Sequence, residues 1–200
     1  MKKRLFVSIS TGLLVLGVII SCMQEKSAAD GKPSVTMKTD STACFKVIYD
    51  ARGISGQVVS YDDMFLCGGG IQGKKGMKYL YERGVRKIVS INPSEREKML
   101  CKKFGMHLVE LPFATDHIPT ATVDSFLVTI QNMNAPLYVH GNDNDVRARI
   151  LGAIYRIYMY KWPYVRAMEE FVALGGSTEN DSLIIASLRT YDRRKEQNNR

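Results

Sequence analysis

The stretch that decides the fold reads APLYVHGNDNDVRARILGAIYRI and covers residues 135–157. The apolar run LYVH, which follows Pro136 and ends in His140, predicts a buried strand. A polar loop that begins with Gly141 follows the strand, and a predicted helix over residues 147–160 follows the loop. The inner face of this helix is predicted from apolar residues at helical spacing: Ile150, Leu151, Ile154 and Ile157.

Strand and helix patterns alternate along the rest of the chain. Short apolar runs predict strands at residues 45–49, 63–70, 85–92, 106–113 and 137–140. Helices are predicted over residues 73–84, 94–105, 120–135, 147–160, 162–176 and 179–194. Ser94 is a candidate helix cap and Gly105 a candidate helix stop. This alternation predicts an α/β domain whose central, mainly parallel sheet of four to five strands is flanked by helices.

The loop after His140 is the candidate site. Ligands of open α/β sheets bind beyond the carboxyl ends of the strands, which is where this loop lies. Unpaired N–H groups and the helix macrodipole at a helix start attract anions. Arg147, at the predicted start of the helix, offers a guanidinium that can bind two phosphate oxygens at once. These features predict a phosphate site of low specificity.

The spacing His140-Gly141-x5-Arg147 resembles the signature loop of the dual-specificity and protein-tyrosine phosphatases, which reads His-Cys-x5-Arg. The likeness extends more diffusely over residues 45–176. Residues 67–97 look like the early strand, helix and strand of that family, and residues 105–130 look like its general-acid loop and the helix after it. The segment 167–175 suits its penultimate helix.

The resemblance implies a role for each matching residue. Arg147 would bind the phosphoryl group, His140 would orient the nucleophile position, and Asp116 would be the general acid. Gly141 stands where the family has its nucleophilic cysteine, and Asn144 stands where it usually has glycine. The implied phosphate-binding set is His140, Asn142, Asp143, Asn144, Asp145, Val146 and Arg147.

Glycine at position 141 predicts impaired catalysis, because the chemistry needs a thiolate that forms a phosphocysteine intermediate. We expect a pseudophosphatase that binds a phosphorylated small molecule or protein. Two alternatives stay open. In one, the domain is an active phosphomonoester hydrolase in which Asp143 or Asp145 orients a water molecule. In the other, it is an interaction module with a dead pocket, in which Arg147 pairs with one of these aspartates.

The first 43 residues carry targeting signals. Lys2, Lys3 and Arg4 precede an apolar run over residues 5–20, which is too short for an ordinary membrane span of about 20 residues but typical of a signal peptide. The run ends in Ile-Ile-Ser-Cys, which resembles the lipobox of bacterial lipoproteins. Residues 1–21 are therefore expected to be a signal peptide, Cys22 the lipidated residue that binds the membrane, 22–43 a flexible tether and 44–200 the domain. The expected location is the bacterial cell envelope outside the cytoplasm; an ordinary secretory signal or an uncleaved anchor is the alternative.

Composition restricts the partners. The formal charge is +8, of which residues 1–21 carry +3. The sequence lacks a basic stripe with interleaved aromatic residues, so a nucleic-acid partner is not expected. Cys67 and Cys101 are expected in the core or in a disulfide, and together with Cys44 they make an odd number, which leaves at least one thiol free. Metal-ligand spacing is absent from the sequence, so neither a metal site nor a cofactor is expected.

Overall fold

The computed structural model describes residues 34–39, 43–114, 117–142, 146–182, 185–186 and 189. The predicted signal peptide and the predicted lipidated Cys22 lie outside these residues and stay predictions. Within the described part of the chain, no helix is both long enough and apolar enough to cross a membrane.

The centre of the molecule is a seven-stranded sheet in the order β1-β2-β3-β4-β7-β5-β6. Its strands are β1 (Ser34–Thr39), β2 (Ala43–Ile48), β3 (Val58–Ser60), β4 (Phe65–Gly68), β5 (Lys87–Ser90), β6 (His107–Glu110) and β7 (Leu137–His140). The strands β4, β7, β5 and β6 pair in parallel, whereas β1 to β4 pair antiparallel. The α/β class is confirmed, and the antiparallel extension makes the sheet larger than the four to five strands expected.

β1 corrects one expected boundary. Residues 34–39 lie in the range expected to be a flexible tether, yet they form the edge strand, with Ser34 opposite Ile48 and Thr39 opposite Ala43. The sheet therefore begins before residue 44. Val35 and Met37 alternate with polar residues in SVTMKT, which is compatible with a strand, but the surrounding stretch is polar and predicts a tether.

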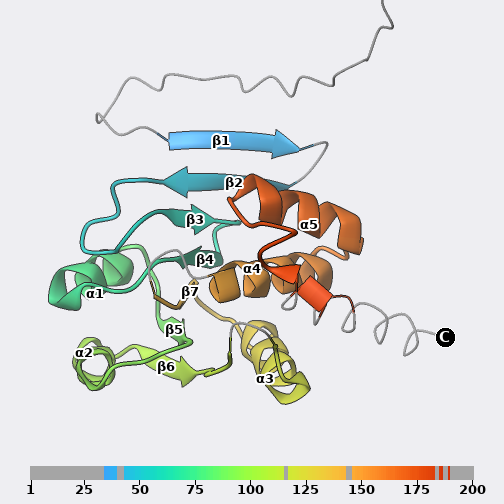
Figure 1. Ribbon diagram of the computed structural model, residues 1–200. Coiled ribbons are helices and arrows are strands. Elements are labelled where there is room, and N and C mark those ends of the chain that lie inside the picture. The colour runs from blue at the N-terminus through green and yellow to red at the C-terminus, as the bar shows by residue number, and fades with distance from the viewer. Residues whose placement is uncertain are drawn as a thin grey trace, which may run out of the picture.

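Helices cover both faces of the sheet (Figure 1). They are α1 (Gly73–Glu82), α2 (Glu95–Phe104), α3 (Thr120–Gln131), α4 (Val146–Met159) and α5 (Tyr164–Ala173). One apolar core joins α3, α4 and α5 to one face, and a second core joins α1 and α2 to the other. Neighbouring strand residues divide between the two cores: Phe65 belongs to the first and Leu66 to the second. This division follows from the two-residue period of strands.

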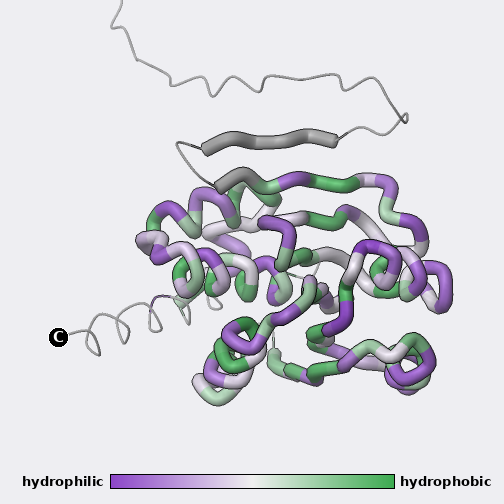
Figure 2. Tube along the Cα trace, turned by 180° about the vertical axis from the view of Figure 1, so that it is seen from behind, coloured by the Kyte–Doolittle hydropathy of each residue, from purple (hydrophilic) through white to green (hydrophobic). Residues whose placement is uncertain are grey.

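Helix ends agree with the local sequence signals. The Ser94 side chain accepts a hydrogen bond from the Glu97 backbone N–H at the start of α2, and Gly105 ends that helix in the left-handed conformation. Helix α3 begins at Thr120, as predicted, and ends at Gln131 before Pro136. Polar and apolar segments alternate along these helices, as expected for helices that lie on a sheet (Figure 2).

Candidate phosphate-binding site

The candidate loop leaves the middle of the parallel part of the sheet. β7 lies between β4 and β5, and all four of its residues are buried. Gly141 is buried and Asn142 is exposed, and α4 begins at Val146. Residues 143–145 of the predicted loop and the predicted general acid Asp116 lie outside the described residues. Their roles therefore stay predictions.

His140 is held by the protein through both ring nitrogens. Its Nε2 lies 2.8 Å from Oε1 of Glu97, and its Nδ1 lies 3.0 Å from the backbone oxygen of Gly141. The side chain is 3% exposed. With both nitrogens engaged in this way, the ring fixes the strand end and the backbone at position 141. This geometry suits the orienting role that the resemblance implies for His140.

Glu97 is a site residue that the sequence reasoning missed. It lies in the first turn of α2, is buried, and accepts a 3.3 Å hydrogen bond from the Ser90 hydroxyl besides its contact with His140. A glutamate three residues after a capping serine is the capping-box signal, which normally predicts a contact with the backbone of the capping residue. Here the carboxylate instead ties α2 to the ends of β5 and β7.

Arg147 lies in the first turn of α4 and is 8% exposed. Its Nη1 donates to the backbone oxygen of Phe113 at 2.5 Å. With the Asn92 amide oxygen facing the guanidinium, Nη2 donates to that oxygen at 2.8 Å, while the amide nitrogen donates to the oxygen of Ile91 at 2.9 Å. These contacts join the segments that follow β5, β6 and β7, beyond the carboxyl ends of these parallel strands.

The oxygens that hold Arg147 in these two contacts are neutral. A carbonyl and an amide oxygen orient the guanidinium, and they use two of its five N–H donors. Asn92 and Phe113 were not predicted as site residues. The available signal was their place just after two parallel strands, where side chains and carbonyls meet at the ligand-binding edge. The predicted alternative pairing of Arg147 with Asp143 or Asp145 involves residues outside the described part.

Gly141 stands at the start of the loop without a side chain that could act as a nucleophile. Positive φ angles among the described glycines are recorded at Gly53, Gly56, Gly73, Gly84, Gly105 and Gly175, and Gly141 is not one of these. Its backbone conformation is therefore open to ordinary residues. A cysteine at this position is compatible with the backbone.

The two cysteines whose side chains are described do not replace the missing thiol. Cys67 and Cys101 are buried, and neither is in a disulfide. Burial, and next the nearby Glu97 carboxylate, raise the pKa of the Cys101 thiol to about 11. A thiol with that pKa is almost entirely protonated near neutral pH and is a poor nucleophile. In the described part of the chain, His, Cys, Asp and Glu side chains form no cluster of three that could hold a metal ion.

The fold and this loop define a class of protein, the cysteine-phosphatase-like α/β domains. The chain resembles P. aeruginosa TpbA with 19% identity and a TM-score of 0.56, over 64% of this chain and 83% of TpbA. It also resembles TpbA crystallised in complex with pTyr, with a TM-score of 0.55 at 19% identity, over 64% of this chain and 82% of that one. The core catalytic domain of the S. cerevisiae PP-IP phosphatase SIW14 has a TM-score of 0.50 at 14% identity, over 64% of this chain and 88% of that one. These likenesses concern the fold.

The family follows from the sequence profile. The profile described as "DSP-PTPase phosphatase fused to NAD+ Kinase" matches residues 37–187. The chain therefore belongs to this family of dual-specificity and tyrosine phosphatase-like domains. No curated protein sequence matches the chain significantly.

Proposed function

We propose that the chain is an envelope lipoprotein whose phosphatase-like domain binds phosphate esters but hydrolyses them poorly, as a pseudophosphatase. One observation carries this proposal. The family's phosphate-binding arginine is present and oriented by Phe113 and Asn92, while the family's nucleophile position holds Gly141. Binding needs the arginine, whereas covalent catalysis needs a nucleophilic side chain at position 141, which glycine lacks.

The ligand proposed for this pocket is a phosphomonoester on a protein or small molecule. A guanidinium in the first turn of a helix combines a fixed charge with the helix dipole, and both favour a phosphate dianion. TpbA, of the same fold, has been crystallised in complex with pTyr. Phosphotyrosine is therefore the first ligand to test.

Oxyanion binding tests the pocket. We expect the full chain to bind vanadate or phosphotyrosine in calorimetric titrations, and Arg147→Met to weaken this binding by about a hundredfold, which corresponds to a charge-assisted contact of roughly 3 kcal/mol. The matched control is Arg149→Met, since Arg149 lies two residues further along α4 and donates instead to the oxygen of Gly175 at 3.0 Å. An unchanged affinity in Arg147→Met would assign the domain to the dead-pocket alternative.

Turnover tests the lost nucleophile. We expect hydrolysis of a generic aryl phosphate far below the 1–10³ s⁻¹ range that is typical of enzymes. The variant Gly141→Cys should gain activity by several orders of magnitude and trap a phosphocysteine, because the histidine and arginine that flank the position are already held in place. A wild-type rate above about 1 s⁻¹ that is lost in Asp143→Ala or Asp145→Ala would instead support the water-based hydrolase.

Lipidation has its own test. The order of basic residues, apolar run, serine and cysteine supports acylation of Cys22 in the cell envelope. Metabolic labelling with a radioactive fatty acid should mark the wild-type chain and not Cys22→Ser. Equal labelling of the two chains would contradict the anchor and leave the phosphate-binding proposal intact.

A further inference from the structure

The positive charge of the chain is concentrated in one layer of the fold. Residues 72–104, which include α1, β5 and α2, contain ten lysines and arginines and three glutamates, a formal charge of +7. The whole chain carries +8, so all other residues together carry +1. The excess positive charge therefore lies almost entirely in this segment. Because α1 and α2 cover the same face of the sheet, it is brought to one side of the molecule.

The two helices lie side by side and run in the same direction. Their starts are close together, because the Arg96 side chain of α2 lies against Gly73 of α1: a Cβ built on that glycine would be 3.0 Å from Nη2 of Arg96. At their ends, the rings of Tyr81 and Phe104 have centroids 6.1 Å apart. Their outer surface, here called the basic face, is formed by six exposed residues: Lys74, Lys75, Lys78, Arg96, Lys102 and Lys103.

The glutamates of this segment do not neutralise the basic face. Glu97 is buried against His140 on the inner side. Glu82 lies 3.6 Å from Lys78, and Glu95 lies 3.2 Å from Lys98, in exposed pairs that are weak in water. Five of the six cations of the basic face are therefore outside the recorded ion pairs of the described chain.

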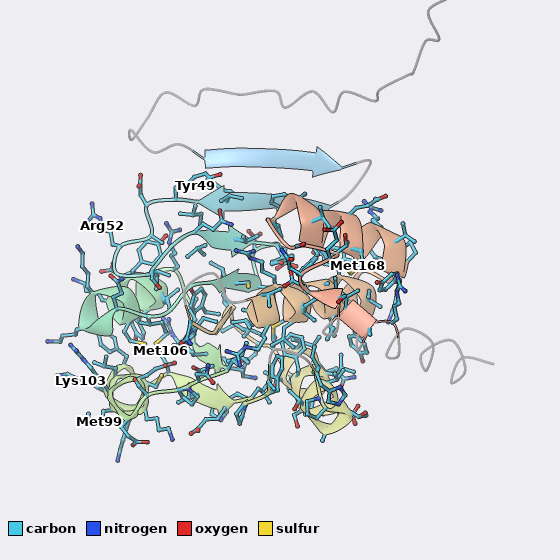
Figure 3. The ribbon with its side chains drawn as sticks, in the orientation of Figure 1. Tyr49, Arg52, Met99, Lys103, Met106 and Met168 are labelled. Atoms are coloured by element: carbon cyan, nitrogen blue, oxygen red, sulfur yellow. The ribbon has the colours of Figure 1, made fainter. Side chains whose placement is uncertain are left out.

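An apolar side chain stands among these cations. Met99 is 66% exposed on α2, one helical turn from Arg96 and from Lys102 and Lys103. Figure 3 shows Met99 and Lys103 directed outward from α2, with Arg52 on the same side of the molecule. An exposed flexible apolar side chain within a ring of long cations is typical of surfaces that lie in the headgroup layer of a membrane.

In Figure 1 the start of β1 lies on the side where α1 and α2 lie. Eleven residues lie between Cys22 and Ser34, and an extended chain of that length spans about 40 Å at most. A lipid on Cys22 would therefore hold the domain within reach of the membrane, with the basic face on the near side.

We infer that the basic face docks on anionic phospholipid headgroups, with Met99 inserted among them. The ammonium and guanidinium groups pair with lipid phosphates, and each contributes about a fivefold change in the docking equilibrium. The inference rests on the proposed anchoring only for proximity to the membrane. A membrane fits this face better than a nucleic acid, because the Arg86 guanidinium lies 3.9 Å over the ring of Tyr81, the exposed aromatic side chain of α1, and competes with bases for that ring face.

Tryptophan fluorescence of the full chain in lipid nanodiscs tests the docking. We expect Met99→Trp emission to be quenched by brominated lipids in discs that contain phosphatidylglycerol, and not in phosphatidylcholine discs. The matched control is Val165→Trp on α5, where the native side chain is 64% exposed, and it should not be quenched in either disc. The buried Trp162 contributes equally to both variants. Adding Lys75→Glu, Lys102→Glu and Lys103→Glu should abolish the quenching.

Each other outcome also decides the matter. If the chain is anchored in the discs but the emission of Met99→Trp is not quenched, the docking is overturned and the anchor is not. If the chain enters neither type of disc, the anchor fails, and Met99→Trp is then titrated with phosphatidylglycerol vesicles. Unchanged emission in that titration overturns the docking. Tighter binding of the same variant to a short DNA duplex than to these vesicles would also overturn it and assign the face to nucleic acid.

Discussion

Helix α4 carries two buried arginines whose surroundings differ in kind. Arg147, in its first turn, is held by the neutral oxygens of Phe113 and Asn92. Arg156, about two and a half turns later on the opposite side of the helix, forms a paired contact with the Glu170 carboxylate, with Nε at 2.9 Å and Nη2 at 3.0 Å. The first arrangement orients a guanidinium at the carboxyl ends of the parallel strands, and the second pairs one with a carboxylate inside the core.

Aromatic rings complete the surroundings of Arg156. Its guanidinium lies 4.8 to 5.1 Å from the ring centroids of Trp162, Tyr160 and Tyr61. Burial raises the pKa of Glu170, and Arg156 opposes that rise. The Nη1 of Arg156 has no hydrogen-bond partner among the described residues, so the rings supply part of its stabilisation. A buried arginine thus has a structural role at one end of α4 and a proposed binding role at the other.

The largest expected effect is on stability, at Arg156. The variant Arg156→Met should lower the free energy of unfolding by about 3–5 kcal/mol, because the buried Glu170 carboxylate loses its partner. Arg156→Met combined with Glu170→Met should recover much of that loss. Urea unfolding measures both, with Arg166→Met as the control, since Arg166 lies 4.0 Å over the Trp162 ring and is only half-buried. A loss below about 1 kcal/mol in the single variant would mean that the pair is not a structural unit.

The second effect is on binding, at Arg147. Arg147→Lys keeps the charge but removes the planar fork, so we expect vanadate affinity to fall about tenfold while the unfolding free energy changes by only about 1–2 kcal/mol. Arg149→Lys is the control and should change neither quantity measurably. If Arg147→Lys costs as much stability as Arg156→Met and leaves binding intact, the two arginines share a structural role and the contrast fails.

The third effect concerns the support of the site, at Glu97. Glu97→Gln should cost about 1–2 kcal/mol of unfolding free energy, because a buried charge-assisted contact with His140 becomes a neutral one. Glu95→Gln, whose native side chain is 85% exposed in the same helical turn, should stay within about 0.5 kcal/mol of the wild type. The imidazole signals of His140 in NMR spectra should move only in Glu97→Gln. Equal spectra would show that Glu97 does not hold the ring.

The smallest effect is at Tyr160, which donates to Oδ2 of Asp62 at 2.7 Å. Tyr160→Phe should cost about 1 kcal/mol, whereas Tyr49→Phe, at an exposed tyrosine, should cost nothing measurable. Burial, and next the hydrogen bond to Asp62, raise the pKa of Tyr160 from 10 to about 12. The folded state therefore holds the phenolic proton more tightly. The stability difference between the wild type and Tyr160→Phe should be complete below pH 10 and shrink as pH rises toward 12. A constant difference across that range would contradict the assignment.

Local signals in the sequence predicted most of the parallel half of the fold. Ser94 and Gly105 bound α2 as expected, and Pro163 precedes α5. The antiparallel half was only partly predicted, because strand β3 has three residues, too few to show a period, and the edge strand β1 has only two apolar residues within a polar stretch. Their pairing depends on β2, which is a contact between segments and not a property of either one.

The sequence by itself determined the α/β class, the position of the strand–loop–helix unit at residues 137–159, and the absence of a thiol at position 141, because these depend on local periodicity and residue identity. Only the tertiary structure decided that Glu97 holds His140, that Asn92 and Phe113 orient Arg147, and that the six exposed cations of α1 and α2 lie on one helical layer. Such contacts join residues that are tens of positions apart. Their partners are selected by the packing of the sheet and its helices, which no local pattern records.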